Sequence, residues 1–493
     1  MTAFAVWLPK DYAIPAYIAS ALLVVSIVRY ITSPRRKLPP GPPGLPIIGN
    51  IRELTDKRWL SLPDCRERYG DVMHLNAMGR SIIILNSQKA AADLLDRRAV
   101  LYSDRPRTPV FDLITDRLHF SFTPFGDLWR RMRKAVTDTF SKANVKQFHA
   151  LQLLEAIIMT SDVLATPEKA HKHYVRAATS MVLQVVYDIP TVRSVEDEKI
   201  QKLEGHVERL LKASMPSRLA NIFHLYISHP SSRLASWKRE ATKGHIFETE
   251  LLNSYVSPVR ADLTKGVDHN GLSAALIKTQ SRNGLTDREL AWLAGSMYVA
   301  GSETTATTMS WWTLAMVAYP EVQKQAQREV DAVVGRDRIP SFADLDNMPY
   351  LRAMMREALR WRPAVPLGIP HMASEDDWYE GMYIPKGSTC LVNMWACNGD
   401  KEIYGEDVDA FNPSRHLDKD GALDAGPADT KDEGHVAFGF GRRTCVGRHV
   451  ANNSLLINMA MMLWATDIRP AKDVQGNTVP VDLHGWVDEG MVL

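Results

Sequence analysis

Near the N-terminus, residues 12–28 are almost wholly apolar and are interrupted only by Ser20 and Ser26. At a helical rise of about 1.5 Å per residue this stretch reaches roughly 25 Å, near the lower limit for crossing a hydrocarbon core of about 30 Å. Basic residues at 29 and 35–37 follow it, whereas Lys10 and Asp11 are its close preceding charges. We therefore expect residues 1–31 to form an uncleaved membrane anchor, with the rest of the chain in the cytosol. A cleaved signal peptide is the alternative, but no small-residue cleavage pattern precedes the basic cluster.

A basic, proline-rich stretch follows the anchor. Residues 37–46 contain five prolines and two glycines, and proline favours an extended, semi-rigid spacer because it fixes φ. We interpret residues 32–50 as a hinge. No repeat, low-complexity tract or second linker follows, so residues 51–493 are expected to form one large domain, whose size suits a protein that encloses a cofactor.

Two β-rich regions stand apart from a long helical part of the chain. Residues 72–86 predict a strand hairpin with its turn near Gly79, and residues 378–393 predict further strands broken at residues 385–387. Helical patterns dominate between these regions, to about residue 360. The pattern predicts a mostly α fold of the α+β kind, with small, segregated β-sheets.

One long helix is predicted in detail. Thr286 and Glu289 form a capping box, Leu285 and Leu290 form the matching hydrophobic staple, and Pro320 ends the pattern. The helix would hold roughly 33 residues and extend about 50 Å. Because it is apolar on nearly every side, we expect it to cross the middle of the protein.

The centre of this helix breaks the pattern. Residues 300–305, Ala-Gly-Ser-Glu-Thr-Thr, put a carboxylate, three hydroxyls and a glycine at its most buried point. Glycine there costs roughly 1 kcal/mol relative to alanine, and an unpaired carboxylate costs more. Threonine hydroxyls can bond to the i−4 carbonyl and bend the helix. Such combined departures in a core predict a functional site.

Charge and cysteine usage exclude several classes of function. The net charge is +2, so we expect no nucleic-acid partner. Four scattered cysteines are too few for a disulfide framework, and without a CxxC pair a structural zinc site is not expected.

Residues 438–447, Phe-Gly-Phe-Gly-Arg-Arg-Thr-Cys-Val-Gly, carry the strongest chemical signal. Three glycines permit a tight loop that brings backbone close to a flat ligand. Arg442, Arg443 and the N-terminus of a helix predicted at residues 448–464 favour a thiolate at Cys445. A buried thiolate in such a loop suits an iron ligand better than an exposed nucleophile; the alternative is a structural cysteine beside a turn.

This segment resembles the haem-binding signature FxxGxRxCxG of the cytochrome P450 family at every fixed position. The matching residues are Phe438, Gly441, Arg443, Cys445 and Gly447. Other motifs of the family follow the expected order: WxxxR at Trp129 and Arg133, the oxygen-activation motif at 300–305, ExxR at Glu357 and Arg360, and Pro-x-Arg at Pro413 and Arg415. The resemblance covers residues 12–490 and is to the microsomal class. Residues 321–362 and 365–371 are most similar to fungal P450 monooxygenases that tailor secondary metabolites.

The resemblance implies a role for each motif residue. Cys445 would ligate the iron of haem b, and Glu303 with Thr304 would relay protons during oxygen activation. Phe438 and Gly447 would frame the haem-binding loop. The haem propionates would be held by Trp129, Arg133, His371 and Arg443. Glu357, Arg360 and Arg415 would maintain the fold, although spacing alone is equally compatible with a surface ion pair.

The resemblance also implies partners and a location. Electrons from NADPH would arrive through NADPH-cytochrome P450 reductase, docked on a basic cluster of Arg130, Arg131, Lys134, Arg442 and Arg448. The substrate would be an apolar small molecule, and the anchor would hold the cytosolic catalytic domain at lipid of the endoplasmic reticulum. Candidate pocket residues are Val110, Phe111, Ile114, Met297, Val365, Leu367 and Ile369.

The predicted function is a haem-thiolate monooxygenase acting on an apolar, secondary-metabolite intermediate. One alternative is a P450-type isomerase or dehydratase, which the Glu303–Thr304 pair disfavours. Another is a non-catalytic haem-binding membrane protein. Three departures from the family pattern are Asn398–Asp400, the Ser414 and His416 neighbours of Arg415, and the end at Leu493, where we expect an incomplete C-terminal hairpin.

Overall fold

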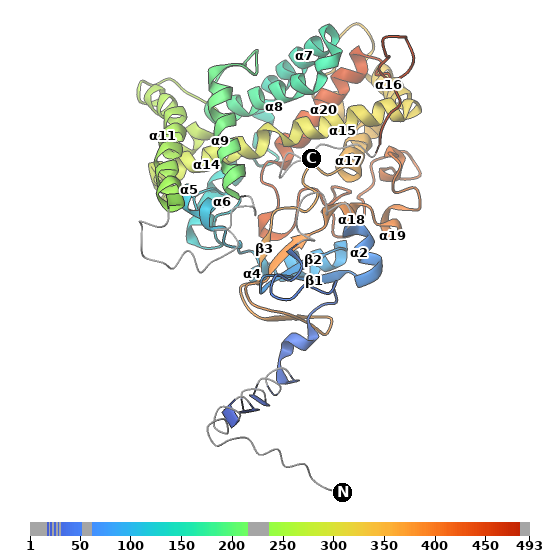
Figure 1. Cartoon of the computed structure of the whole chain (residues 1–493). Coiled ribbons are helices and arrows are strands. Elements are labelled where there is room, and N and C mark those ends of the chain that lie inside the picture. The colour runs from blue at the N-terminus through green and yellow to red at the C-terminus, as the bar shows by residue number, and fades with distance from the viewer. Residues whose placement is uncertain are drawn as a thin grey trace.

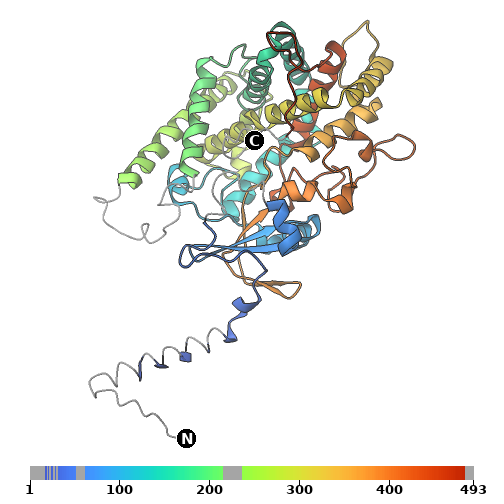
Figure 2. The same cartoon turned by 45° about the vertical axis from the view of Figure 1, so that its right-hand side comes forward.

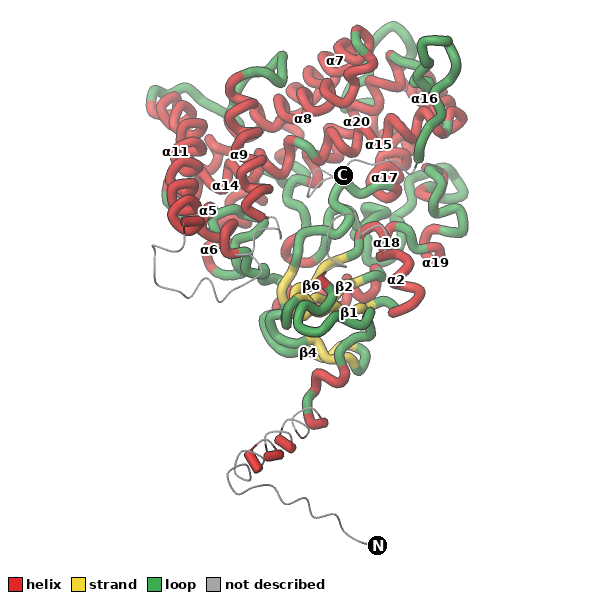
Figure 3. Tube along the Cα trace, viewed as in Figure 1, coloured by secondary structure: helices red, strands yellow, loops and turns green. Residues whose placement is uncertain are grey.

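The computed structural model describes residues 17, 18, 20, 21, 24, 25, 28, 31–51, 62–214 and 236–483, with residues 62–64 and 236 by their backbone alone. Helices form most of the body, and the strands gather at the end from which the N-terminal segment leaves (Figures 1 and 3). This arrangement confirms the predicted mostly α fold with small, segregated sheets. An incomplete hairpin was expected at the C-terminus. Residues 484–493 lie outside the described residues.

The helices are α2 (Leu62–Tyr69), α3 (Gln88–Ala91), α4 (Ala99–Tyr102), α5 (Pro109–Thr115), α6 (Asp127–Thr139), α7 (His149–Ala165), α8 (Ala170–Tyr187), α9 (Glu198–Ser214), α11 (Ser236–Thr264), α12 (Leu272–Lys278), α13 (Gln280–Asn283), α14 (Asp287–Ser302), α15 (Thr304–Ala318), α16 (Pro320–Val334), α17 (Pro349–Trp361), α18 (Met394–Asn398), α19 (Lys401–Tyr404) and α20 (Arg448–Ala465). The strands are β1 (Val72–Ala77), β2 (Arg80–Leu85), β3 (His371–Met372), β4 (Asp377–Tyr379), β5 (Met382–Ile384) and β6 (Thr389–Val392).

The predicted hairpin forms with its turn at Met78 and Gly79. Both residues have positive φ, 50° and 87°, which a two-residue hairpin turn of type I′ requires. Strands β1 and β2 pair antiparallel, and β2 continues the sheet by parallel pairing with β6 in the order β1-β2-β6-β3. The second β-rich region forms as predicted and contains one further turn, because β4 and β5 make their own hairpin.

The long central helix is present but divided. The capping box at Thr286 and Glu289 starts α14 as predicted, and the helix breaks at Glu303 before α15 continues to Ala318. The Thr304 hydroxyl donates to the Ala300 carbonyl over 3.0 Å, the i−4 bond expected to bend a helix. The prediction of one unbroken helix is therefore wrong at a single residue, whereas the bend is confirmed. Helices α14 and α15 cross the middle of the helical layer (Figure 1).

A buried carboxylate joins distant parts of the chain. Glu357 on α17 is fully buried and binds Arg360 at 2.7 Å and Arg415 at 3.1 Å, so the surface ion-pair interpretation is wrong. His416 is a third partner, with its Nε2 2.9 Å from a Glu357 oxygen. No motif or spacing predicts that contact. Arg360 also donates to the Asn398 and Val408 carbonyls, and these bonds tie α17 to the end of α18 and to the loop after α19.

Replacing Glu357 by glutamine should lower the free energy of unfolding by about 3–5 kcal/mol, because it leaves two buried cations without their counter-charge. Urea denaturation measures the change. Glu321→Gln is the matched control. Glu321 and Lys324 are also three residues apart in sequence and form an ion pair of 2.9 Å, but both side chains are largely exposed. The control should change the free energy of unfolding by less than about 1 kcal/mol.

The pH dependence of the same variant separates charge from packing. Burial alone would raise the pKa of Glu357, but hydrogen bonds from Arg360 and His416 outweigh it and lower this pKa to about 2 from 4.5. The stabilisation is therefore present above about pH 4.5 and is lost as the pH falls toward 2. Wild type should lose stability over this range more steeply than Glu357→Gln. Parallel pH profiles would contradict the assignment.

Candidate active site

The Cys445 loop leads from a 3₁₀ turn, Gly441–Arg443, into helix α20. Gly441 has a φ of 62°, and a Cβ there would meet the Leu95 carbonyl oxygen, so only glycine fits. The Cys445 N–H donates to the Phe438 carbonyl over 2.9 Å and closes the loop. The loop thus presents the Cys445 side chain from a fixed backbone just before the N-terminus of α20.

The electrostatic surroundings of the sulfur favour an anion only in part. Burial raises the pKa of the Cys445 thiol, whereas the Gly447 N–H, Arg133 and Arg448 act to lower it. Cys445 is nonetheless accessible to solvent. A residue that is surrounded by protein and still accessible borders a space inside the protein. The Gly447 N–H donates to the Cys445 sulfur.

The two arginines that precede Cys445 each lie over an aromatic ring. Arg442 lies over the Phe125 ring, 5.2 Å from its centroid, and Arg443 lies over the Trp129 ring at 4.3 Å. Both Arg133 and Arg448 act on the sulfur. Arg133 also donates to the Thr444 carbonyl over 2.8 Å. The contribution predicted for Arg442 and Arg443 stays a prediction, and Arg133 is a further cation that acts on the sulfur.

Trp129 and Arg443 form a site for an anion. Arg443 donates to the Ser103 and Thr123 carbonyls over 2.9 and 2.7 Å. Its remaining Nη1 and the Trp129 Nε1 are buried without a hydrogen-bond partner in the described part of the chain. Unsatisfied buried donors are costly, and a carboxylate beside the stacked pair would satisfy both.

Two further cationic or basic side chains adjoin this pair. His371 on β3 is buried, and its Nδ1 donates to the Tyr102 carbonyl at 2.7 Å. The side chain of Arg105, which sequence reasoning missed, donates to the carbonyl oxygens of Ser121, Ile369 and Pro370. Burial and then repulsion from Arg105 lower the pKa of both His371 and Arg443. An anion here would relieve that repulsion and favour the protonated imidazole.

The break between α14 and α15 exposes the predicted polar residues. Ala300 is exposed and Gly301, Glu303 and Thr304 are half-buried, although α14 is buried over most of its length. A Cβ at Gly301 would lie 2.7 Å from a Val182 methyl group, so this glycine serves close packing against α8. The carboxyl and hydroxyl groups of Glu303 and Thr304 therefore border accessible space at the centre of the protein.

The donor set fits an iron porphyrin. A single thiol held by loop amides suits an axial iron ligand, and the Trp129–Arg443 pair with Arg105 and His371 suits two carboxylates. Three predicted residues lie near the thiol. The Phe438 carbonyl accepts the Cys445 N–H, the Gly447 N–H donates to Cys445, and Arg133 donates to the Thr444 carbonyl.

Comparisons with known proteins agree with this geometry. The family model described as cytochrome P450 matches residues 39–481. A cytochrome P450 monooxygenase of Armillaria gallica is 50% identical over 97% of this chain and 92% of its own length. One from Postia placenta is 39% identical over 97% and 90%, and one from Amanita muscaria is 38% identical over 88% and 85%. The chain belongs to the cytochrome P450 family and is a haem-thiolate monooxygenase.

Proposed function

We propose that this monooxygenase is anchored in the endoplasmic reticulum, receives NADPH electrons through a cytochrome P450 reductase, and oxidises an apolar intermediate of secondary metabolism. The observation that carries the proposal is an apolar cluster directly beside the polar break of the central helix. The break supplies acid and alcohol groups, and the cluster supplies a surface for a hydrocarbon body. These are the two needs of a reaction that inserts oxygen into an unactivated substrate.

The apolar cluster joins α5 to the central helix. Val110 and Phe111 are buried, and Ile114, Phe122 and Val299 pack against them. The Phe111 and Phe122 rings meet edge to face at 4.8 Å. Because Val299 immediately precedes the exposed Ala300, this cluster supports an apolar substrate site.

The other candidate pocket residues lie in different parts of the core or are half-buried outside the apolar cluster. Met297 packs in the core formed by α6, α8 and α14, and Leu367 packs against the sheet beside Ile84. Val365 and Ile369 are half-buried. The proposed pocket therefore centres on Val110, Phe111 and Ile114, since neither Met297 nor Leu367 shares their cluster.

The residues of the site would divide the work between holding the cofactor and moving protons. Cys445 would bind the iron, and the propionates would be held by Trp129, Arg443, His371 and Arg105. Arg133, predicted as a further propionate ligand, acts on Cys445 and donates to the Thr444 carbonyl. Haem, when bound, supplies the activation of dioxygen. The Thr304 hydroxyl would pass a proton from its Oγ1 into the site, and the Glu303 carboxyl would replace that proton. Both groups sit at a helix break, where their geometry departs from the regular backbone.

The proposed reductase-docking face is narrower than the predicted basic cluster. Arg130 and Arg442 lie over the same Phe125 ring, at 4.8 and 5.2 Å. With Lys134 they form no ion pair to a described carboxylate, whereas Arg131 binds Asp127 at 2.9 Å. Arg448 lies 3.7 Å from Glu433. Unpaired exposed cations steer an acidic partner more effectively than paired ones, so Arg130, Lys134 and Arg442 are the proposed contacts.

The membrane assignment concerns residues 1–31, with residues 32–50 as hinge and 51–493 as catalytic domain. Tyr17, Val24, Val28 and Ile31 are each more than half exposed, and the described N-terminal segment extends away from the body (Figure 2). Exposed apolar side chains on a projecting helix support a lipid partner. Among the described residues, Asn144–Ala165 is also long and apolar enough to span a membrane, but its helix α7 packs against α8 and α20.

Thr304→Ala should uncouple electron use from oxidation. Loss of the hydroxyl slows proton delivery, and such steps contribute about 10²–10⁴-fold to rate. Product formed per NADPH consumed should fall at least about tenfold. The measurement compares NADPH and product in membranes that contain the reductase, with a substrate found by screening terpenoids and polyketides.

The matched control is Thr304→Ser, which keeps a hydroxyl and should keep most of the coupling. Full coupling in Thr304→Ala would remove this residue from proton delivery. Equal uncoupling by both substitutions would assign the effect to packing at the helix break.

Trp129→Phe should weaken haem retention while it preserves the ring beneath Arg443. A hydrogen bond to a charged group is worth about 1.5–3 kcal/mol, which corresponds to roughly 10- to 100-fold faster haem loss. Transfer of haem to apomyoglobin measures the rate. Trp464→Phe is the control, because its Nε1 donates to the Gly335 carbonyl over 2.9 Å. Equal rates in wild type and Trp129→Phe would exclude Trp129 as a propionate ligand.

A further inference from the structure

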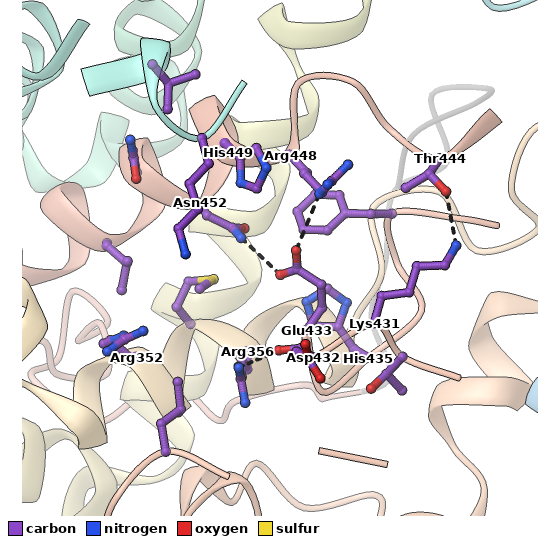
Figure 4. Close-up of a pocket in the computed structure, with 18 of the residues that line it drawn as sticks. Arg352, Arg356, Lys431, Asp432, Glu433, His435, Thr444, Arg448, His449 and Asn452 are labelled. Carbon is purple, nitrogen blue, oxygen red and sulfur yellow. Dashed lines mark hydrogen bonds and ion pairs between the residues drawn. The ribbon is translucent and has the colours of Figure 1, made fainter. Parts of the chain in front are cut away.

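A hollow lies against the Cys445 loop and is lined in part by Arg133 and Phe438. Its volume is about 830 Å³, within the range of roughly 300–1,000 Å³ of small-molecule sites. Residues of α17, α20 and the loop before Phe438 line it, together with residues near the start of α7 (Figure 4). Phe438, Gly439, Gly441 and Thr444 form part of its wall, so anything bound there touches the segment that holds Cys445.

The cavity carries an excess of positive charge. Seven arginine and lysine side chains line it against four carboxylates. Asp429 is engaged by Arg97 at 2.7 Å and Glu433 by Arg448 at 3.7 Å. Figure 4 shows Glu433 linked to Arg448 and Asn452. The carboxylates of Glu433, Asp432 and Asp424 act on Arg356, but the lining as a whole keeps more cations than carboxylates.

Two of those cations stand one turn apart on α17. Arg352 repels Arg356, and like charges at this spacing destabilise a helix, whereas Glu433 acts on Arg356 more strongly in the opposite sense. Arg356 donates to the Asp424 and Asp432 carbonyls, both at 2.5 Å. Neither arginine forms an ion pair with a carboxylate, and Lys142 forms none either, in the part of the chain that the structure describes. A bound anion would offset this arrangement.

A buried hydrogen-bond donor adds an independent indication. His435 lines the cavity and is 2% exposed. Its Nδ1 accepts the Ala437 N–H over 3.1 Å, so in the neutral ring the proton is on Nε2. Burial, with repulsion from His416 and Arg356, lowers the pKa of His435 to about 3 and keeps it neutral. Nε2 is buried without a partner, and a buried N–H requires an acceptor.

The remaining wall is apolar and aromatic. Phe342 stacks on His149 with centroids 3.7 Å apart and an angle of 8° between the ring planes. Leu345, Met355 and Leu456 also line the cavity. A site with cations on one side and an aromatic wall on the other suits a ligand with an anionic group and an apolar body.

The geometry points to a binding site for a small organic phosphate, held by Arg352, Lys142 and the His435 Nε2–H, with its apolar body against Phe342. The excess charge favours a dianionic phosphate, and guanidinium groups match phosphate oxygens. The site is separate from the proposed substrate pocket and does not depend on the proposed substrate or partner. A ligand there would contact the Cys445 loop, where it can alter the setting of the thiolate.

Isothermal titration calorimetry of the haem-loaded, full-length protein with phenyl phosphate tests the site. One saturable site with a Kd below about 1 mM is expected. Inorganic phosphate should bind more weakly, and benzyl alcohol should not compete. Arg352→Gln combined with Lys142→Gln should weaken binding at least about tenfold, because one charge-assisted hydrogen bond is worth that factor. Neither side chain holds the fold through an ion pair, so the variant should remain folded.

The matched control is Lys169→Gln with Lys172→Gln, which removes the same charge from exposed positions on the protein. This control should bind phenyl phosphate as wild type does. Binding that is unchanged in Arg352→Gln/Lys142→Gln, or weakened equally in the control, overturns the proposal. Absence of binding to wild type, together with a raised KM for the reductase in the Arg352→Gln/Lys142→Gln variant, overturns it in favour of docking by acidic side chains of the reductase.

Discussion

The buried carboxylate of Glu357 is the constraint on which much of this structure depends. A lone charge at that depth would be strongly destabilising, so its position requires Arg360 from the same helix and Arg415 from a segment far along the chain. Once both arginines and His416 are in place, α17 and the segment after α19 cannot move independently. This network therefore holds the framework from which the loop before Cys445 begins.

The network reaches toward the thiolate side of the protein through histidines. His416 contacts Glu357, and Gly434 packs closely against the His416 ring, since a Cβ at Gly434 would lie 2.8 Å from it. The next residue, His435, packs against Phe438 with ring centroids 5.4 Å apart. The Phe438 carbonyl receives the Cys445 N–H. A chain of close contacts thus runs from a fold-maintaining ion pair to the proposed iron ligand. The proposed phosphate site lies against the last members of this chain.

Much of the fold follows from local sequence, and the failures have a common cause. The turn at Gly79, the capping box at Thr286 and the i,i+3 pair of Glu357 and Arg360 depend on residues close in sequence, and all form as predicted. Arg105 and His416 were missed because their partners lie far away in sequence. The effect of Arg133 on Cys445 was missed because the two residues lie far apart in sequence. The break at Glu303 could not be located from the sequence, because Thr304, Thr308 and Thr313 all donate to i−4 carbonyls while the helix is interrupted at one residue.

The central claim is that Cys445 supplies a thiolate to haem iron, and the carbon monoxide difference spectrum of the reduced protein tests it most directly. The measurement uses membranes expressing the full chain, with Cys445→Ala as the comparison. The account predicts the far red-shifted Soret band of thiolate-ligated haem in wild type and its loss in the variant. A histidine-type band in well-folded wild type, or a thiolate-type band that survives in Cys445→Ala, would contradict it.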